Sequence, residues 1–447
     1  MKFKIILTIA IAIAAIRISA QIPSGYYDNA NGLSGAELRQ ALHDIIDGHS
    51  SQSYSALWND FISTDIKSNG KVWDIYSDIP GETPPYEYNF ISDQCGNYAQ
   101  EGDCYNREHT WPKSWFNEDY PMYTDLFHLM PTDGYVNGQR GNDPYGETRD
   151  PFWTSQNGSK LGISCFSTMT GTVFEPIDAY KGDVARNYLY MATRYYNEDA
   201  GWYQNELVDG AGFTPAGLGL ILKWHNQDPV SQKEIDRNNE IYDIQNNRNP
   251  FIDHPEYAEA IWGDINTPPY FVDFLDNMTL IEGDNYSTTI HYGDDDISSV
   301  TVSLDCIFCN ADFITVTPVE DGAVSINMDP TSGDAGTYSI AIMADDGTND
   351  VANYSISLTI EAGNAISEFE KHFTLSPNPS KNTFTIQNNT ERIINTISVY
   401  SVEGKLVETI KVNQSSNIQF GQDYSAGYYL IHVFTNDSMY SYKLIKE

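Results

Sequence analysis

The stretch CYNREHTWPKSWF at residues 104–116, followed by DLFHLMPTDGYVNGQRGN at residues 125–142, decides the fold and chemistry of the first part of this chain. The first stretch sets the carboxylate of Glu108 directly before the imidazole of His109, and the second brings the side-chain amide of Asn137. Carboxylate and amide oxygens bind hard divalent cations, and a neutral imidazole can take a proton from water. These side chains together predict metal-assisted hydrolysis of a phosphodiester.

The length and the N-terminus predict an exported protein of several domains. A chain of 447 residues is too long for one ordinary core, and about two to four domains are expected. Residues 1–20 combine two lysines with a long apolar run and small residues at the end, which is typical of a secretory signal peptide. No later stretch approaches the ~20 apolar residues of a membrane span. We therefore expect a secreted protein without a transmembrane segment, either released or attached to the cell surface.

The charge balance is strongly acidic, with 25 basic and 62 acidic residues and a formal net charge of −37. This balance argues against nucleic-acid binding through a broad basic patch, because phosphate affinity normally comes from Lys and Arg. It does not exclude an enzyme in which a cation bridges protein and phosphate. A well solvated extracellular surface explains the acidic total equally simply.

The chain has five cysteines, too few for a disulfide scaffold. Cys95 and Cys104 flank the first motif closely enough to pair, and Cys306 and Cys309 form a C-x-x-C, so two local disulfides are predicted. The C-x-x-C also suits zinc or redox chemistry, although it lacks a second pair and a βαβ context. Cys165 is left single.

Composition and periodicity divide the rest of the chain into regions. Residues 21–267 predict an α+β domain rich in aromatic residues, with helices at 34–49, 182–197, 215–227 and 231–251. Residues 268–362 alternate apolar and polar positions in short runs, which predicts a small Ig- or cadherin-like β-sandwich. Its acidic turns at 293–296 and 345–350 suit Ca²⁺ or plain solvation. A linker at 363–372 leads to a second predicted β-sandwich at 373–447.

Five ordered segments of the first region resemble the endonuclease I family of secreted bacterial nucleases, which use the ββα-metal fold. The segments are NREHTWPKSWF (106–116), DLFHLMPTDGYVNGQRGN (125–142), FEPIDAYKGDVARNYLYM (174–191), LKWHNQDPV (222–230) and NRNPFIDHPE (247–256). The last region, with LSPNPSKNTFTI and GYYLIHV, resembles the C-terminal sorting domain that directs proteins through the type IX secretion system.

The resemblance implies roles for the motif residues. It makes Glu108 and Asn137 the metal ligands, with Mg²⁺ as the expected ion and Mn²⁺ or Ca²⁺ as alternatives, and His109 the general base. It implies cleavage of DNA, and also RNA, without sequence preference and with 5′-phosphate products. Consecutive side chains of a strand point to opposite faces, so Glu108 and His109 can serve one site only if the strand twists or bulges.

Basic residues near the motif are candidates for phosphate contact. Arg140 is the leading candidate as a catalytic residue, and Arg107 and Lys113 are candidates for substrate binding; a structural salt bridge is an equal alternative for each. Phe127 departs from the family, since many members have a histidine there. The arginine that steadies the scissile phosphate in some members lies in a loop that this chain lacks.

The resulting prediction is a secreted, divalent-metal-dependent endonuclease that is monomeric and recognised by the type IX secretion machinery. The competing interpretation is a surface adhesin or binding protein built on an inactive nuclease scaffold. A third is a metal phosphoesterase acting on small nucleotides or lipids. Cleavage of supercoiled plasmid with and without EDTA distinguishes them.

Overall fold

The computed structural model describes residues 22–447 except 167–168, 170, 307–310, 364–368, 371, 391, 413–416 and 437. Contacts divide the chain into two units. One unit comprises Met1–Val272, Tyr292–Thr301 and Met343–Tyr354, and the other Asp273–His291, Val302–Ile342 and Ser355–Glu447. Within the described part of the chain, no helix has the length and apolar character that a membrane crossing requires.

A strand, a second strand and a short helix form the centre of the first unit. Strands β1 (Tyr105–His109) and β2 (Leu129–Asp133) pair antiparallel, and α3 (Gly134–Arg140) follows β2 directly. The side chain of Asp133 caps the helix by accepting the N–H of Val136 at 2.7 Å, which satisfies a helix-terminal donor. The order expected from the resemblance is therefore present.

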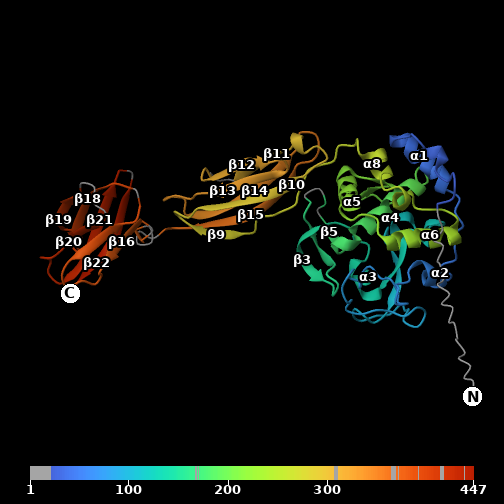
Figure 1. The fold of residues 1–447 in the computed structure, drawn as a ribbon, viewed down its shortest axis with the longest axis horizontal. Helices are drawn as coiled ribbons and strands as arrows, with labels where there is room; N and C mark the ends of the chain where they lie inside the picture. The colour runs from blue at the N-terminus through green and yellow to red at the C-terminus, as the bar shows by residue number, and fades with distance from the viewer. Residues whose placement is uncertain are drawn as a thin grey trace, which may run out of the picture. The chain divides into compact units, whose positions relative to one another are not determined.

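Further helices accompany this motif in the same unit (Figure 1). They are α1 (Gly35–Ile46), α2 (Leu57–Thr64), α4 (Lys181–Arg194), α5 (Pro215–Gln227), α6 (Gln232–Gln245), α7 (Pro250–Asp253) and α8 (Tyr257–Trp262). Strands β3 (Thr148–Thr154), β4 (Lys160–Ser164) and β5 (Thr172–Glu175) form a small antiparallel sheet, and β6 (Val208–Asp209) pairs with β7 (Gly212–Phe213).

Helix α4 differs from the amphipathic helix that its sequence predicts, because every one of its residues is buried. Its charged side chains are paired inside the protein. Arg186 donates to both carboxylate oxygens of Glu234 on α6, at 2.5 and 2.9 Å. Polar residues in α4 therefore mark internal ion pairs and not a solvent face, which corrects the sequence interpretation.

The helix predicted for residues 231–251 ends earlier than expected. Ser231 and Glu234 form a reciprocal capping box at the start of α6. The helix stops at Gln245 because Asn246 takes a left-handed conformation with φ 63°. A separate turn, α7, begins at Pro250, so the predicted single helix is two.

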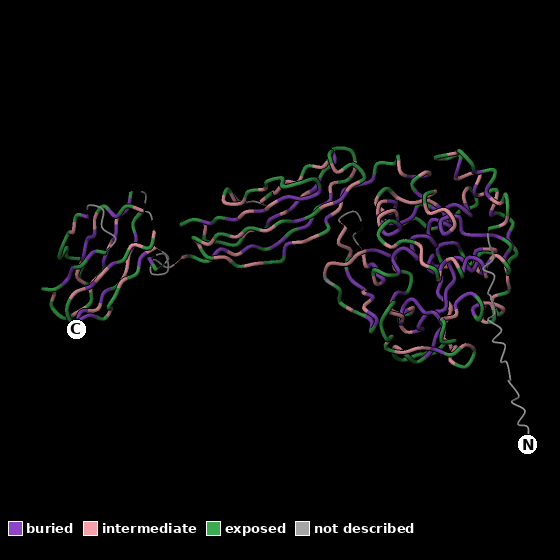
Figure 2. Tube along the Cα trace, viewed as in Figure 1, coloured by how far each residue is buried: buried purple, intermediate pink, exposed green. Residues whose placement is uncertain are grey.

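An aromatic core holds the first unit together, and most of its central chain is buried in Figure 2. Trp111, just after β1, has no exposed surface. The centre of its ring lies 4.8 Å from the ring centre of Tyr188 and 5.8 Å from that of Trp202. Removing a buried aromatic side chain of this size typically costs about 3–5 kcal/mol. Trp111 thus anchors the end of β1 to α4.

The region after the helices is built from strands, as predicted. One sheet has the order β12-β13-β10-β8 and a second the order β11-β14-β15-β9. The strands are β8 (Tyr270–Phe271), β9 (Met278–Ile281), β10 (Tyr286–Gly293), β11 (Thr301–Cys306), β12 (Ile314–Glu320), β13 (Ala323–Met328), β14 (Gly336–Asp345) and β15 (Ala352–Glu361). Burial alternates along β14 and β15, so each strand turns one face inward.

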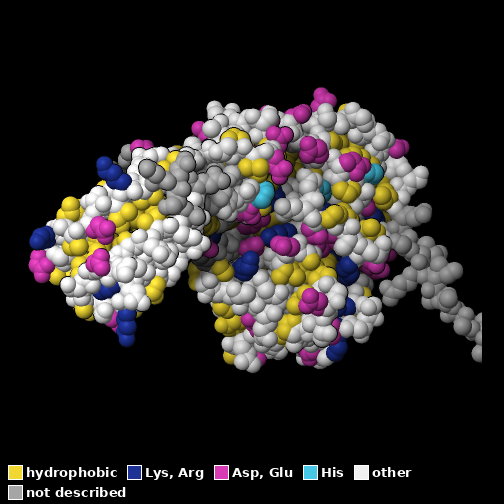
Figure 3. Space-filling view, turned by 60° about the vertical axis from the view of Figure 1, so that its left-hand side comes forward, with side chains coloured by type: hydrophobic (Ala, Val, Ile, Leu, Met, Phe, Trp, Pro, Cys, Tyr) yellow, Lys and Arg dark blue, Asp and Glu magenta, His cyan; other side chains and the backbone are white. Residues whose placement is uncertain are grey.

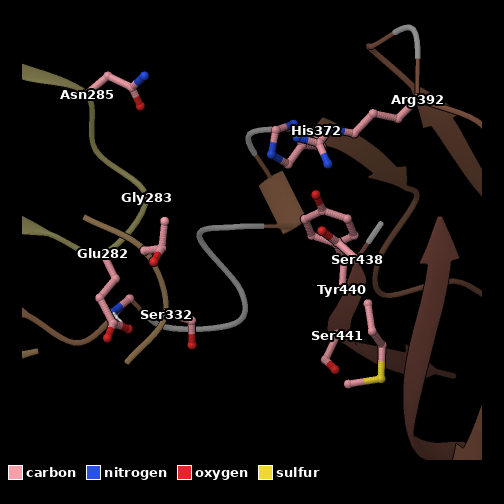
Figure 4. Close-up of a pocket in the computed structure, with 12 residues that line it drawn as sticks. Glu282, Gly283, Asn285, Ser332, His372, Arg392, Ser438, Tyr440 and Ser441 are labelled. Carbon is pink, nitrogen blue, oxygen red and sulfur yellow. Dashed lines mark hydrogen bonds between the residues drawn. The ribbon is translucent and has the colours of Figure 1, made fainter. Parts of the chain in front are cut away.

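The acidic turns of this region form hydrogen bonds with their own backbone. Asp296 accepts the N–H of Ser298 at 3.2 Å, and Asp346 accepts the N–H of Thr348 at 2.9 Å. At another turn, Glu282, which is labelled in Figure 4, accepts the N–H groups of residues 333, 335 and 363. Hydrogen bonding of this kind suits turn residues without any bound cation.

The last region consists of two small sheets. They have the orders β16-β17-β20 and β19-β18-β21-β22. Their strands are β16 (Phe373–Ser376), β17 (Phe384–Asn388), β18 (Ile394–Ser401), β19 (Leu406–Lys411), β20 (Asn417–Phe420), β21 (Gly427–Thr435) and β22 (Met439–Lys446). Lys446, on the last strand, is buried and donates to the carbonyl of Gly421 at 2.7 Å. The C-terminal strand is therefore fixed at its very end.

Candidate active site

Glu108 lies near the end of β1 with only 3% of its surface exposed. Its Oε1 accepts hydrogen bonds from Nη1 of Arg140 at 2.5 Å and from the hydroxyl of Tyr76 at 3.1 Å. Burial raises the pKa of Glu108, whereas the charge of Arg140 and both hydrogen bonds oppose that rise. Among the described residues both bonds reach Oε1, so Oε2 is the oxygen left to coordinate a cation.

Arg140, the last residue of α3, is completely buried. Besides Glu108, its guanidinium donates to the main-chain carbonyls of His109, Thr110 and Asp143 at 3.0, 2.8 and 3.1 Å. Phosphate contact and a structural salt bridge were equal alternatives for Arg140, and these contacts favour the salt bridge. The hydrogen bonds that this buried guanidinium forms within the described residues all go to protein oxygens, so its charge acts on the site through Glu108.

Asn137, in the middle of α3, donates from Nδ2 to Oδ1 of Asn106 at 2.7 Å. Asn106 stands two residues before Glu108 on β1, so both side chains leave the same face of the strand. With Nδ2 held in this way, Oδ1 of Asn137 is the atom left to coordinate a cation. The sequence prediction omitted Asn106, although its spacing from Glu108 was a signal that could have identified it.

His109 is the last residue of β1, and its Nε2 lies 3.1 Å from the carbonyl oxygen of Tyr123. A carbonyl oxygen can only accept a hydrogen bond, so Nε2 carries the proton and Nδ1 keeps its lone pair. Burial lowers the pKa of His109 well below its usual value, and the nearby His128 adds to that effect. The imidazole is therefore neutral near pH 7, and Nδ1 can accept a proton.

The structure brings Glu108, Asn106 and Asn137 to one face of β1. The ladder between β1 and β2 runs through five residue pairs without a bulge, so His109 leaves the strand on the opposite side from Glu108. The bulge that a shared site was expected to need is therefore absent from this ladder, and the imidazole and the carboxylate leave β1 on different faces. Arg140 links the two positions, because its Nη1 binds both the Glu108 carboxylate and the His109 carbonyl.

Arg107 and Lys113 lie on the His109 side among tyrosines. The Arg107 guanidinium is 3.6 Å from the centre of the Tyr54 ring and donates to the Tyr54 carbonyl at 2.6 Å. The Lys113 side chain is 41% exposed and forms an ion pair with Glu118 at 2.7 Å. Lys113 is thus accessible to a substrate, whereas Arg107 already has protein partners.

Phe127 and His128, which directly precede β2, behave as core residues. Phe127, where the family often has histidine, is buried with its ring 4.6 Å from that of Tyr190. His128 is buried too, and its Nε2 lies 2.8 Å from the carbonyl of Met122. These contacts support the interpretation of both positions as packing.

The predicted disulfide next to the motif is present. Cys95 and Cys104 are bonded, with their Cα atoms 5.7 Å apart. Cys104 precedes β1 directly, so the bond closes the loop that leads into the site strand. Cys165 is a free cysteine, and burial raises the pKa of its thiol to about 12. Of the second predicted pair, Cys309 lies outside the described residues.

A cluster of His43, Asp47 and Glu198 lies away from the motif, and its ligand atoms fall within 4.8 Å of one another. A metal site is one chemical use of such a group. However, the guanidinium of Arg194 pairs with Asp47 at 2.7 Å and with Glu198 at 3.1 Å. Since a protein cation already neutralises both carboxylates, the cluster is explained without a metal ion.

The surface carries the acidic charge that the composition predicts. Asp and Glu side chains are spread over the face drawn in Figure 3. Basic side chains near the motif, such as Arg140, are engaged with protein oxygens instead. Among the basic residues predicted for this site, Lys113 is the accessible one, with its side chain 41% exposed.

Two family models match the chain. The model described as endonuclease I matches residues 34–256, and the model described as secretion system C-terminal sorting domain matches residues 374–447. The first match covers β1, β2 and α3, and therefore every motif residue. The second covers the two small sheets at the end of the chain.

Curated relatives of the first region are extracellular and periplasmic nucleases. The chain is 40% identical over 251 residues to an extracellular ribonuclease of Bacillus amyloliquefaciens, covering 53% of this chain and 78% of that protein. It is 38% identical over 244 residues to an extracellular ribonuclease of Bacillus subtilis, with the same coverage of 53% and 78%. A periplasmic deoxyribonuclease of Aeromonas hydrophila is 29% identical over 132 residues, covering 30% of this chain and 48% of that protein.

Proposed function

The chain belongs to the endonuclease I family, and on this basis we propose that it hydrolyses the phosphodiester bonds of DNA and RNA without sequence preference. It is a secreted nuclease with a C-terminal type IX sorting domain. The observation that supports the substrate and mechanism is the arrangement of Glu108 and Asn137. Each has one side-chain oxygen without a hydrogen-bond partner among the described residues, and the neutral His109 follows Glu108 at the end of β1.

A divalent cation fits the donor set of the site. Oε2 of Glu108 and Oδ1 of Asn137 are hard oxygen donors, and Mg²⁺ commonly takes only one or two protein ligands, which favours Mg²⁺ over Mn²⁺ or Ca²⁺ here. Family members generally depend on a divalent metal. Such an ion would polarise a phosphate oxygen and stabilise the charge that develops on the leaving oxygen. A single carboxylate leaves the site a net positive charge for the anionic substrate.

His109 serves as the general base in this proposal. Its Nδ1 accepts a proton from the water that attacks phosphorus, while Nε2–H stays bonded to the carbonyl of Tyr123. The water oxygen forms the new bond to phosphorus, the bond to the 3′-oxygen breaks, and the leaving 3′-oxygen takes a proton from solvent, so the products carry a 5′-phosphate and a 3′-hydroxyl. The hydrogen bond that orients His109 uses the main-chain carbonyl of Tyr123, so a side-chain substitution at Tyr123 does not remove it.

Three further residues act as positioning residues. Arg140 and Tyr76 fix Oε1 of Glu108, and Asn106 fixes the amide of Asn137. These contacts hold each ligand oxygen in one orientation before a cation binds. Outer-shell partners of this kind typically change metal affinity or activity about 10–100-fold when removed.

The proposal is tested with supercoiled plasmid and with single-stranded RNA, each with Mg²⁺ and with EDTA. We expect cleavage with Mg²⁺, none with EDTA, and none by His109→Ala, whose far-UV circular dichroism should match the wild type. His291→Ala, an exposed histidine of the β-strand region, is the matched control. Ligation of the products without prior phosphorylation identifies 5′-phosphate ends.

The outcomes separate the competing functions. Full cleavage by His109→Ala would remove the base assignment, and failure of the wild type to cut either polymer under any divalent ion would favour the binding-protein alternative. Cleavage restricted to mononucleotide or lipid phosphodiesters would favour the small phosphoesterase instead.

A further inference from the structure

Three tyrosines form a cluster on the His109 side of β1, which we call the tyrosine platform: Tyr54, Tyr120 and Tyr123. The Tyr54 and Tyr123 rings stack with centres 4.6 Å apart and planes 23° apart. The Tyr120 ring lies 5.5 Å from the Tyr123 ring, and 57% of Tyr120 is exposed. The platform therefore runs from the protein interior to an accessible aromatic surface.

The platform is joined directly to the proposed general base. The His109 ring lies 5.4 Å from the Tyr123 ring, with the two planes only 20° apart. The Tyr123 carbonyl is also the partner that orients His109 Nε2. A nucleic acid whose phosphodiester reaches Nδ1 of His109 therefore has its neighbouring nucleotide close to Tyr123 and Tyr120.

Cations border the platform on both sides. The Arg107 guanidinium is held between the faces of Tyr54 and Trp58, 3.6 and 4.3 Å from their ring centres, and this fixes the Tyr54 ring in place. On the other side, Nζ of Lys113 lies 5.6 Å from the centre of the Tyr123 ring. Tyr123 is also the ring that contacts Tyr120, so a charge beside Tyr123 suits the phosphate that accompanies a base stacked on Tyr120.

Lys113 can exchange its partner for a phosphate. Its ion pair with Glu118 joins two exposed side chains, and pairs of this kind contribute little to stability. The hydrogen bond to Glu118 raises the pKa of Lys113, so the ammonium keeps its charge throughout the neutral range. A phosphate oxygen can therefore replace the Glu118 carboxylate at small cost.

We propose that the tyrosine platform binds an unpaired nucleobase of the substrate, with the exposed Tyr120 as the stacking surface and Lys113 at the adjacent phosphate. This proposal deepens the proposed nuclease function and names single-stranded DNA or RNA as the preferred substrate class. In a duplex each base face is covered by its neighbours, whereas unpaired bases are free to stack on aromatic side chains. Stacking depends on no particular base, which agrees with cleavage without sequence preference.

The test measures binding without hydrolysis. Fluorescence anisotropy in EDTA compares a labelled single-stranded oligonucleotide, an abasic strand of the same length and the matching duplex. The full-length wild type should bind the base-bearing strand more tightly than the other two. Tyr120→Ala should weaken binding of that strand about 5- to 100-fold and leave abasic binding unchanged, whereas Tyr120→Phe should stay within about twofold of the wild type.

Two results would overturn the platform. The first is that the wild-type protein binds the abasic strand or the duplex as tightly as it binds the base-bearing strand. The other is a Tyr120→Ala protein that binds all strands like the wild type. Tyr428→Ala, a tyrosine of the last region with 53% exposure, is the matched control. The binding measurement contains no divalent cation, so it remains informative if the hydrolysis proposal fails. If the plasmid assay instead shows normal cleavage, the binding measurement can still refute the platform.

Discussion

Arg140 and Glu108 form an ion pair inside the protein, with Nη1 and Oε1 2.5 Å apart. The pair is part of a closed ring of contacts. The Arg140 guanidinium lies 4.2 Å from the centre of the Tyr145 ring, the Tyr145 hydroxyl is 2.6 Å from that of Tyr76, and Tyr76 donates back to Glu108. Each member holds the next, so the carboxylate proposed to bind the cation has one orientation.

Arg140→Met should destabilise the protein and abolish nuclease activity. The substitution leaves Glu108 buried without its counterion, which typically costs about 3–5 kcal/mol. Urea unfolding followed by tryptophan fluorescence measures the lost stability of the nuclease region, because all 8 tryptophans precede residue 263.

The double variant Arg140→Met/Glu108→Gln is the companion measurement for the ion pair. A neutral amide at position 108 no longer needs a counterion, so the double variant should be more stable than Arg140→Met alone. Strictly additive losses in the three proteins would show that the two side chains are not coupled.

Asn106→Ala should weaken divalent-cation binding while leaving the fold intact. Without Asn106 the Asn137 amide loses the partner of its Nδ2, so Oδ1 is no longer held toward the cation. We expect roughly tenfold weaker Mn²⁺ affinity by isothermal titration in the absence of substrate. Asn69→Ala, at an exposed turn, is the control, and an Asn106→Ala affinity equal to that of the wild type would contradict the positioning role.

Local sequence signals predicted those parts of the fold that depend on neighbouring residues. Helix α5 begins and ends where expected, since Thr214 caps it and Pro215 occupies its first turn. The disulfide between Cys95 and Cys104 also follows from the short spacing of the two cysteines, whereas the order of β1, β2 and α3 was expected from the family resemblance. Features of this kind are determined by residues a few positions apart in the sequence.

Features that depend on distant contacts could not be predicted in this way. Tyr76 binds Glu108 from 32 residues upstream, in a turn-rich segment without periodicity. The charged residues of α4 indicated a solvent face, yet Arg186 pairs with Glu234, which is 48 residues away. The sequence also does not distinguish the two roles of Arg140, because a basic residue beside a motif gives the same sequence signal whether it faces the substrate or the core.

Stability should fall as the pH falls below about 6.5, partly because of His225. Burial, followed by the charge of Arg186, lowers the pKa of His225 to about 4. The unfolded chain binds a proton at this residue near pH 6.5, and the folded chain does so only near pH 4. The folded state therefore binds fewer protons between these two pH values. The contribution of His225 to the free energy of unfolding is complete above pH 6.5 and is lost as the pH falls toward 4.

The size of this effect is at most roughly 3 kcal/mol, from the difference between the two pKa values. Urea unfolding at pH 7.5, 6 and 5 measures it, and His225→Gln should flatten the decline. The amide of glutamine can still donate to the Pro255 carbonyl, which accepts from His225 Nε2 at 3.0 Å in the wild type. An equal decline in His225→Gln and in the exposed-site control His291→Gln would exclude His225 as a source.

Loss of the disulfide between Cys95 and Cys104 should lower the stability of the nuclease part without changing its chemistry. The bond joins residues separated by 9 positions, and Cys95 N–H donates to the Tyr105 carbonyl at 3.1 Å, so the closed loop is tied to the first residue of β1. Cross-linking a loop of this length typically stabilises by about 2–3 kcal/mol. Cys95→Ser/Cys104→Ser should show this loss in the tryptophan-monitored urea midpoint and retain wild-type kcat at 25 °C. Reductant should shift the wild-type midpoint to that of the double variant and leave the variant unchanged; a further shift in the variant would mean that another bond carries the effect.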